Sequence, residues 1–87
     1  MRYTLLWHED ALRDLKNIDK KDAKKIVKKV ESYLPQEPSK LGKPLVGHLE
    51  GFLRYRIGKY RIIYHIQENK LVVLVLKVGR RDKVYRR

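Results

Sequence analysis

The sequence predicts one α+β domain, residues 1–87, in which two N-terminal helices pack on a mostly antiparallel β-sheet of about four strands. Residues 52–66, FLRYRIGKYRIIYHI, alternate with period two, which predicts a hairpin. Residues 71–78 are apolar on both parities, which is typical of a central strand covered on both faces. Between residues 19 and 34, apolar side chains recur at helical spacing and predict one buried stripe. That stripe consists of Ala23, Ile26, Val27, Val30, Tyr33 and Leu34.

The N-terminal part predicts one strand before the two helices. Residues 2–7, RYTLLW, are rich in β-compatible side chains and predict that strand. Residues 9–17 predict a short helix with acids in its first turn, and His8 at its N-cap has a structural rather than a catalytic role. Asp19 is a suitable N-cap for the second helix, and Pro35 ends it. The outer face of that helix is a lysine run more typical of a solvated surface than of a nucleic-acid contact: Lys20, Lys21, Lys24, Lys25, Lys28 and Lys29.

The rest of the chain predicts a connector, the hairpin and a last strand. Residues 36–51 are punctuated by glycine and proline and predict an irregular connector. In the hairpin, Gly58-Lys59 suits a two-residue type II′ turn, because its first position requires positive φ. Residues 68–70 predict the next turn, and Gly79 is expected to break the last strand. The turn places Arg56 opposite Arg61 and puts these side chains on the face away from the core: Arg54, Arg56, Arg61, Ile63 and His65.

Charge favours a polyanionic partner. The net charge is +12, and it is uneven: residues 1–37 hold nine Lys+Arg against seven Asp+Glu, whereas residues 38–87 hold thirteen against three. Seven of the nine arginines lie from Arg54 onward. Arginine suits bidentate recognition of phosphate, so the C-terminal half is expected to meet nucleic acid.

Several other classes of protein are disfavoured. The chain has no cysteine, which leaves no disulfide framework or thiolate chemistry. No apolar run reaches the length of a membrane span, and the N-terminus does not resemble a signal peptide. His48 is isolated, without a second ligand at metal spacing. We therefore expect a soluble, cytoplasmic protein without metal or other cofactor.

The order of these elements, with RYRIGKYRIIYHI and VVLVLKVGRRDKVY, resembles the RelE/ParE superfamily of toxin-antitoxin toxins, in particular its RelE branch of mRNA interferases. The resemblance covers nearly the whole chain. It implies a ribosome-dependent endoribonuclease that cuts mRNA in the decoding site and so inhibits translation. In that reaction, which needs no metal, the 2′-OH attacks the adjacent phosphate and leaves a cyclic phosphate and a 5′-OH. The resemblance also implies a cognate acidic antitoxin of the RelB kind, with operator DNA contacted only through the antitoxin complex.

Carried over residue by residue, the family's catalytic groups fall on five positions: Arg54, Arg56, Arg61, Arg81 and Tyr85. The resemblance implies that Arg61 and Arg81 stabilise the transition-state charge, with Arg81 near the leaving 5′-oxygen, and that Tyr85 stacks on or orients a nucleotide. Contacts with RNA or the ribosome are expected from Arg54, Arg56, Arg80, Lys83, Arg86 and Arg87.

One departure leaves the general base open. RelE-like sites typically carry lysines on the first hairpin strand, and one of them is usually proposed as the base, but this chain has Arg54 and Arg56 there. Arginine is not deprotonated in proteins and acts mainly through its charge. His65, whose unperturbed pKa of ~6.5 suits proton transfer, and Tyr85 are the alternative bases, although a polar residue lining the sheet is the simpler interpretation of His65. The other functional hypotheses are a ParE-like inhibitor of DNA gyrase and a non-catalytic nucleic-acid-binding module.

Overall fold

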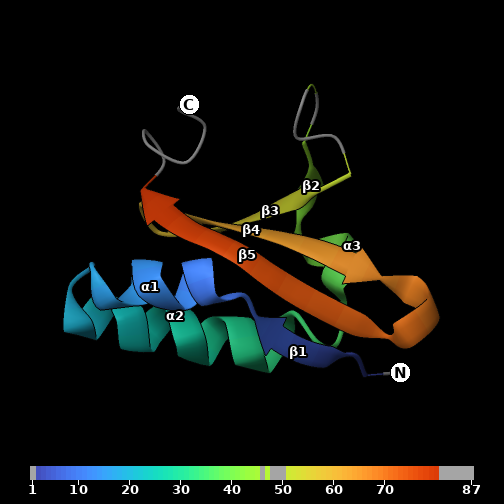
Figure 1. The fold of residues 1–87 in the computed structure, drawn as a ribbon, viewed down its shortest axis with the longest axis horizontal. Coiled ribbons are helices and arrows are strands. Elements are labelled where there is room, and N and C mark those ends of the chain that lie inside the picture. Colours follow the sequence, from blue (N-terminus) through green and yellow to red (C-terminus); the bar gives the residue numbers. More distant parts are fainter. Residues whose placement is uncertain (1, 46, 48–50, 81–87) are drawn as a thin grey trace.

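The computed structural model describes residues 2–45, 47 and 51–80 (Figure 1). In these ranges two longer helices precede most of the sheet, so the predicted α+β class is confirmed. The elements in chain order are β1 (Thr4–Trp7), α1 (Glu9–Lys16), α2 (Lys20–Tyr33), α3 (Pro38–Leu41), β2 (Lys43–Pro44), β3 (Leu53–Ile57), β4 (Tyr60–Gln67), the 3₁₀ turn η2 (Glu68–Lys70) and β5 (Val72–Arg80).

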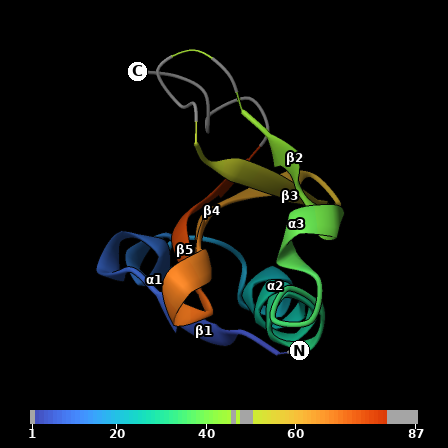
Figure 2. The same cartoon turned by 90° about the vertical axis from the view of Figure 1, so that its right-hand side faces the viewer.

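The five strands that the described residues form make one sheet in the order β1-β5-β4-β3-β2. Strands β2, β3, β4 and β5 are antiparallel to their neighbours in sequence, whereas β1 lies parallel to β5. Helices α1 and α2 lie together on one side of the sheet (Figures 1 and 2). The prediction of about four strands missed β2, which lies with α3 in the segment expected to be irregular.

The β3–β4 hairpin has the register that its turn predicts. Arg56 lies opposite Arg61, and Ile57 lies opposite Tyr60. Gly58 has φ of 58°, and Leu71 is the one non-glycine with positive φ in the described part of the chain. Lys59 therefore has negative φ, which fits the type II′ turn rather than type I′.

Strand β5 contains an irregularity that changes which side chains reach the core. Ile63 pairs with Lys77 but Tyr64 pairs with Val75, so Leu76 is an extra residue in β5. The core positions of β5 consequently change parity and are Val73, Val75 and Val78. This change explains part of the apolar run on both parities.

Two predictions for β5 need correction or refinement. The strand is central, between β1 and β4, as predicted, but Leu74 and Leu76 on its second face are only half-buried. Gly79 does not break the strand, because it pairs with Arg61 and β5 continues to Arg80. Glycine tolerates extended backbone, and the ladder to β4 holds it there.

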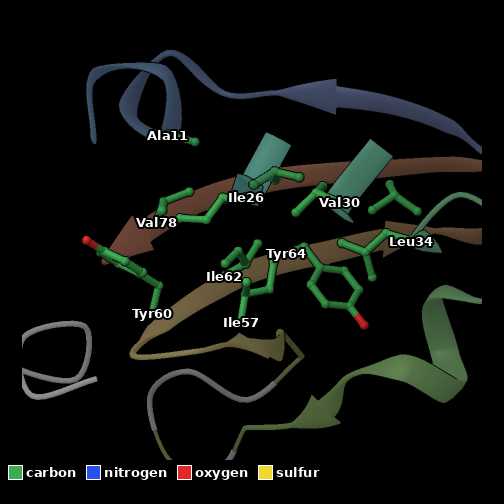
Figure 3. Packing of buried hydrophobic residues seen from close by; sticks show 11 residues of the cluster. Ala11, Ile26, Val30, Leu34, Ile57, Tyr60, Ile62, Tyr64 and Val78 are labelled. Atoms are coloured by element: carbon green, nitrogen blue, oxygen red, sulfur yellow. The ribbon is translucent and has the colours of Figure 1, made fainter. Parts of the chain in front are cut away.

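The core lies between α2 and the sheet (Figure 3). Ile26, Val30 and Leu34, four residues apart, are fully buried against side chains such as Ile62 and Tyr64. Each such aliphatic side chain contributes about 1.5–3 kcal/mol through burial. Tyr33, predicted in the same stripe, is 52% exposed, because it is rotated by about 100° around the helix from Leu34.

Tyr64 connects this core to α3, which lies in the predicted connector of residues 36–51. Its hydroxyl donates a hydrogen bond to the carbonyl oxygen of Pro38 at the start of α3. Burial raises the pKa of Tyr64 from 10.0 to about 12, because the ionised phenolate would lose its hydration. Gly42 packs against the same ring: a Cβ there would lie 2.8 Å from Tyr64 Cζ and closer still to its oxygen. Tyr64 and Gly42 thus fix α3 and β2 against β3.

Candidate nucleic-acid interface

Cationic side chains gather on the sheet face opposite α1 and α2. The register pairs Lys43 with Arg54 and Arg56 with Arg61, and directly paired residues project from the same side of a sheet. We call these four residues the arginine face. Its members are held differently, since Arg56 is exposed, Arg54 is half-buried and Arg61 is only 5% exposed.

The four cations of the arginine face line one pocket of about 240 Å³ at the edge of β3. Leu41 of α3 and Tyr55 also line it, so the described lining holds four cations and no carboxylate. Burial raises the pKa of Tyr55, and its phenol therefore stays neutral there at physiological pH. A pocket with this lining favours an anion with several oxygens, such as a phosphate diester.

The register places two like charges directly opposite each other. Like charges directly opposite in an antiparallel pair are unfavourable by a few tenths of a kcal/mol or more, and Arg56 and Arg61 are placed in this way. Arg61 keeps its charge when buried, because guanidinium does not lose its proton in proteins. A buried, oriented cation of this kind is suited to stabilising negative charge that develops on a bound group.

His65 lies on the same side of β4 as Arg61, but in a different environment. It makes an edge contact with Phe52, whose ring centroid is 5.7 Å away. Phe52 in turn packs against Leu45 and Ile63 in a small second apolar cluster. The rise of a strand separates the Cα atoms of residues 61 and 65 by about 13 Å. His65 therefore borders this cluster, and the pocket of the arginine face does not include it.

Arg80 lies on the other side of the sheet from the arginine face. It pairs with Tyr60, which belongs to the core face. The Tyr60 hydroxyl donates a 2.8 Å hydrogen bond to Asp22 Oδ2. This bond is the largest cause of the raised pKa of Tyr60, and the charge of Arg80 acts in the opposite direction. The remaining predicted site residues lie outside the described residues: Arg81, Lys83, Tyr85, Arg86 and Arg87.

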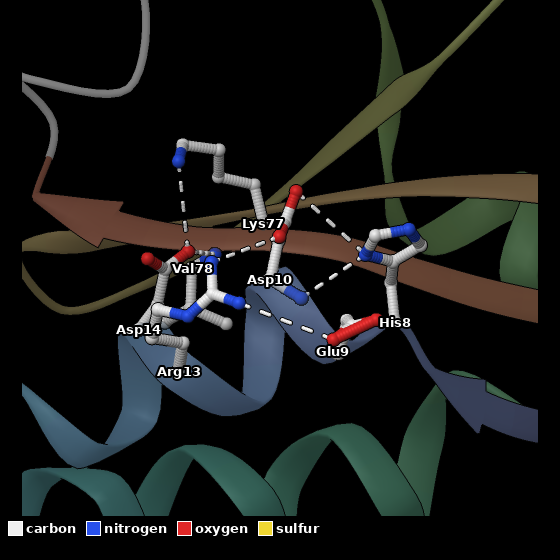
Figure 4. Close-up of polar contacts among 7 residues, drawn as sticks. All are labelled: His8, Glu9, Asp10, Arg13, Asp14, Lys77 and Val78. Atoms are coloured by element: carbon white, nitrogen blue, oxygen red, sulfur yellow. Dashed lines mark hydrogen bonds and ion pairs between the residues drawn. The ribbon is translucent and has the colours of Figure 1, made fainter.

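A polar cluster on α1 was not anticipated from the sequence (Figure 4). Asp14 accepts a 3.0 Å hydrogen bond from the Val78 backbone N–H and lies 3.9 Å from Lys77 Nζ. His8 Nδ1 accepts a bond from the Asp10 N–H, which agrees with the structural role expected for His8. A lone aspartate in a helix gives no sequence signal for such a contact, because its partner is 64 residues away.

In the part of the chain that the structure describes, no group of three His, Cys, Asp or Glu side chains is placed to hold a metal ion. None of the helices there is long and apolar enough to cross a membrane.

A small basic α+β protein whose cations converge on one pocket of its sheet has the charge pattern that is typical of proteins that bind a polyanion. The particular family follows from comparison with known proteins. The chain belongs to the ParE toxin family of type II toxin-antitoxin systems (parDE), whose model matches residues 5–85. It is thus a RelE/ParE superfamily toxin, as the sequence resemblance implied.

Individual relatives agree with this family. The chain is 34% identical to toxin RelG of Mycobacterium tuberculosis over 87 residues, which are 100% of both chains. It is 38% identical to toxin RelE of the same organism, over 87% of this chain and 78% of that protein. A chain in the RelBE2 toxin-antitoxin complex from M. tuberculosis superposes with a TM-score of 0.88 at 32% identity, covering 93% of this chain and 100% of that one. The archaeal RelE-RelB complex from Pyrococcus horikoshii shares the fold, with a TM-score of 0.73 at 23% identity over 97% of this chain and 100% of that one.

Proposed function

We propose that this toxin is an endoribonuclease that cleaves mRNA in the ribosomal decoding site without a metal ion. The observation that carries the proposal is the convergence of Lys43, Arg54, Arg56 and Arg61 on one pocket. Two like charges lie directly opposite each other at Arg56 and Arg61, and an RNA phosphate between them would offset their repulsion.

The reaction proposed is transesterification within the RNA. The 2′-oxygen loses its proton and attacks the adjacent phosphorus, the bond from phosphorus to the 5′-oxygen breaks, and that oxygen takes up a proton. The products are a 2′,3′-cyclic phosphate and a 5′-OH. Charge accumulates on the phosphorane oxygens, so Arg61 stabilises the transition state from a fixed, buried position, and Arg54 and Arg56 hold the RNA backbone.

The reaction also needs a base for the 2′-OH proton and a proton for the leaving 5′-oxygen. Arg81 is proposed to act near the leaving oxygen, and Tyr85 to stack on a nucleotide or to serve as the base. His65 is the other candidate base, and its position beside Phe52 rather than beside Arg61 weighs against it. Arg80, Lys83, Arg86 and Arg87 are proposed to contact RNA or the ribosome, with Arg80 approaching from the other side of the sheet.

The partner that neutralises this toxin is proposed to be an acidic, RelB-like antitoxin. Solved complexes of relatives pair RelE with RelB, including the one from M. tuberculosis. An acidic segment would satisfy the arginine face, because it supplies the same kind of anionic oxygen as RNA. Binding of operator DNA is assigned to the antitoxin complex rather than to this chain alone.

The test is primer extension on an mRNA in a translation reaction, with and without ribosomes. We expect discrete cuts that require ribosomes, a loss of about 10²–10³ in rate for Arg61→Ala, and a similar loss for Arg81→Ala. Lys59→Ala is the matched control, because Lys59 is an exposed cation in the same hairpin that does not line the pocket. Equal losses in Lys59→Ala and Arg61→Ala would contradict a specific role for the arginine face, and absence of cuts by the wild type would refute the nuclease.

Inhibition of DNA gyrase is the second candidate, since the matching family model is that of the ParE toxins. A supercoiling assay separates the two: inhibition of gyrase without cleaved mRNA would select this candidate. A passive nucleic-acid binder would do neither, and its affinity for RNA would fall steeply with salt.

A further inference from the structure

In the part of the chain that the structure describes, β5 has a neighbouring strand on its β1 side only as far as Val75. Strand β1 pairs with β5 only up to Trp7 and Val75, and the next backbone bond, 2.8 Å long, joins His8 N–H to Val75 O. The chain then turns into α1 and leaves the rest of the β5 edge. A strand edge without a partner presents free N–H groups that need an acceptor.

Asp14 supplies that acceptor from α1. Its carboxylate accepts the N–H of Val78 at 3.0 Å, and only 22% of its side chain is exposed (Figure 4). The bond lies next to the irregularity at Leu76, where the ladder to β4 is disturbed. The ion pair with Lys77 is longer, 3.9 Å, and the Lys77 side chain is 53% exposed, so it contributes less than the backbone bond.

Asp14 holds the stretch of β5 that pairs with β4 around Arg61. Val78 is followed by Gly79, which pairs with Arg61, and by Arg80 at the strand's end. A shift of β5 at residues 78–80 would move Arg61, which pairs with Gly79, and would change the direction in which the chain leaves Arg80. Placement errors of about 1 Å are known to cost catalysis up to about a hundredfold.

We propose that Asp14 is a positioning residue: its carboxylate takes the place of the missing strand beside β5 and fixes residues 78–80 opposite Arg61. It contacts no substrate. The activity part of this inference rests on the proposed nuclease function, whereas the structural part does not.

The structural part is tested by amide hydrogen exchange of Val78 in the full chain. We expect Asp14→Ala to speed this exchange by about tenfold or more, with Val75 unchanged, because one hydrogen bond is lost. Asp14→Asn keeps an acceptor oxygen without the charge and should restore most of the protection. Asp10→Ala is the matched control, since Asp10 lies on the same helix and forms an exposed ion pair with Arg13. Exchange of Val78 at the wild-type rate in Asp14→Ala would overturn the inference.

The activity part is tested by ribosome-dependent cleavage with the same variants. We expect kcat to fall by about tenfold or more in Asp14→Ala with the KM for ribosomes unchanged, and to recover in Asp14→Asn. If Asp14 only stabilises the fold, kcat of the folded Asp14→Ala variant would equal that of the wild type. An unchanged kcat would therefore overturn the positioning role. If the wild type cleaves nothing, the positioning role fails with the nuclease, and the exchange of Val78 still decides whether Asp14 holds β5.

Discussion

Replacing Gly42 by alanine tests how tightly α3 and β2 are fixed to the core. Gly42 has φ of −98° and ψ of 169°, an ordinary extended conformation, so alanine would add no backbone strain. Its Cβ would lie 2.8 Å from Tyr64 Cζ and 2.9 Å from Arg54 O, and still closer to the Tyr64 oxygen. Tyr64 is fully buried and has no room to move. Overpacking costs about 1–3 kcal/mol and loss of the bond to Pro38 about 1 kcal/mol, so we expect about 2–4 kcal/mol in all.

The assay is thermal and urea unfolding of the full chain. For a domain of this size, about 2–4 kcal/mol corresponds to a fall in Tm of about 10–25 °C. Gly58→Ala is the control, because it strains the backbone without overpacking. Nothing lies within 4 Å of the added Cβ, but a φ of 58° is unfavourable for alanine by about 1 kcal/mol. The Gly42→Ala and Tyr64→Phe changes should combine less than additively, because they share one contact. Wild-type stability of Gly42→Ala would refute the packing described.

Three further results are expected. Burial raises the pKa of Tyr64 to about 12, so the neutral phenol stabilises the fold fully below about pH 10. This contribution of about 3 kcal/mol is lost as the pH rises toward about 12. Tyr64→Phe should reduce the loss of stability at alkaline pH in urea unfolding, and an unchanged loss would contradict this. Asp19→Ala removes the 2.8 Å cap to the Lys21 N–H and should cost about 1 kcal/mol in the same assay; no loss would show that the cap is not needed. His65→Gln should cleave mRNA at nearly the wild-type rate, because His65 borders Phe52, whereas a loss as large as that of Arg61→Ala would identify His65 as the base.

The hairpin was the most predictable part of the molecule, for a local reason. A glycine in the first position of a two-residue loop fixes both the turn type and the register, and the register fixes which side chains share a face. The pairing of Arg56 with Arg61 followed from the sequence alone and is confirmed. The second helix was similarly accessible, since Asp19 caps it and its apolar spacing marks the buried side.

Contacts between distant segments were not predictable in the same way. The parallel pairing of β1 with β5 joins residues almost 70 positions apart, and no local pattern encodes it. The two-residue strand β2 carries no periodicity, and it depends on Gly42 fitting against Tyr64. The extra residue Leu76 appears in the sequence only as an uninterrupted apolar run.

In the candidate site, too, local features were predictable from the sequence and long-range features were not. Alternation along the hairpin brought Arg54, Arg56 and Arg61 to one face, but it gave no indication that Arg61 is buried. Burial of Arg61 depends on the strands and connector around it. The sequence predicts an RNA contact for Arg80 but does not show on which side of the sheet it lies, which its pairing with Tyr60 decides.

The order of the strands has a consequence for synthesis of the protein. Strand β5 joins β1 to β4, yet it is the last to be made of the strands that the structure describes. Until residues 72–80 have been translated, β1 has no strand beside it and β4 lacks one of its two neighbours. The apolar side chains of the N-terminal half then remain without most of their sheet partners, and the nascent chain relies on late, long-range pairing to close its core. Arg61 on β4 pairs with Gly79 of β5, so it gains its second neighbouring strand only after residues 72–80 have been made.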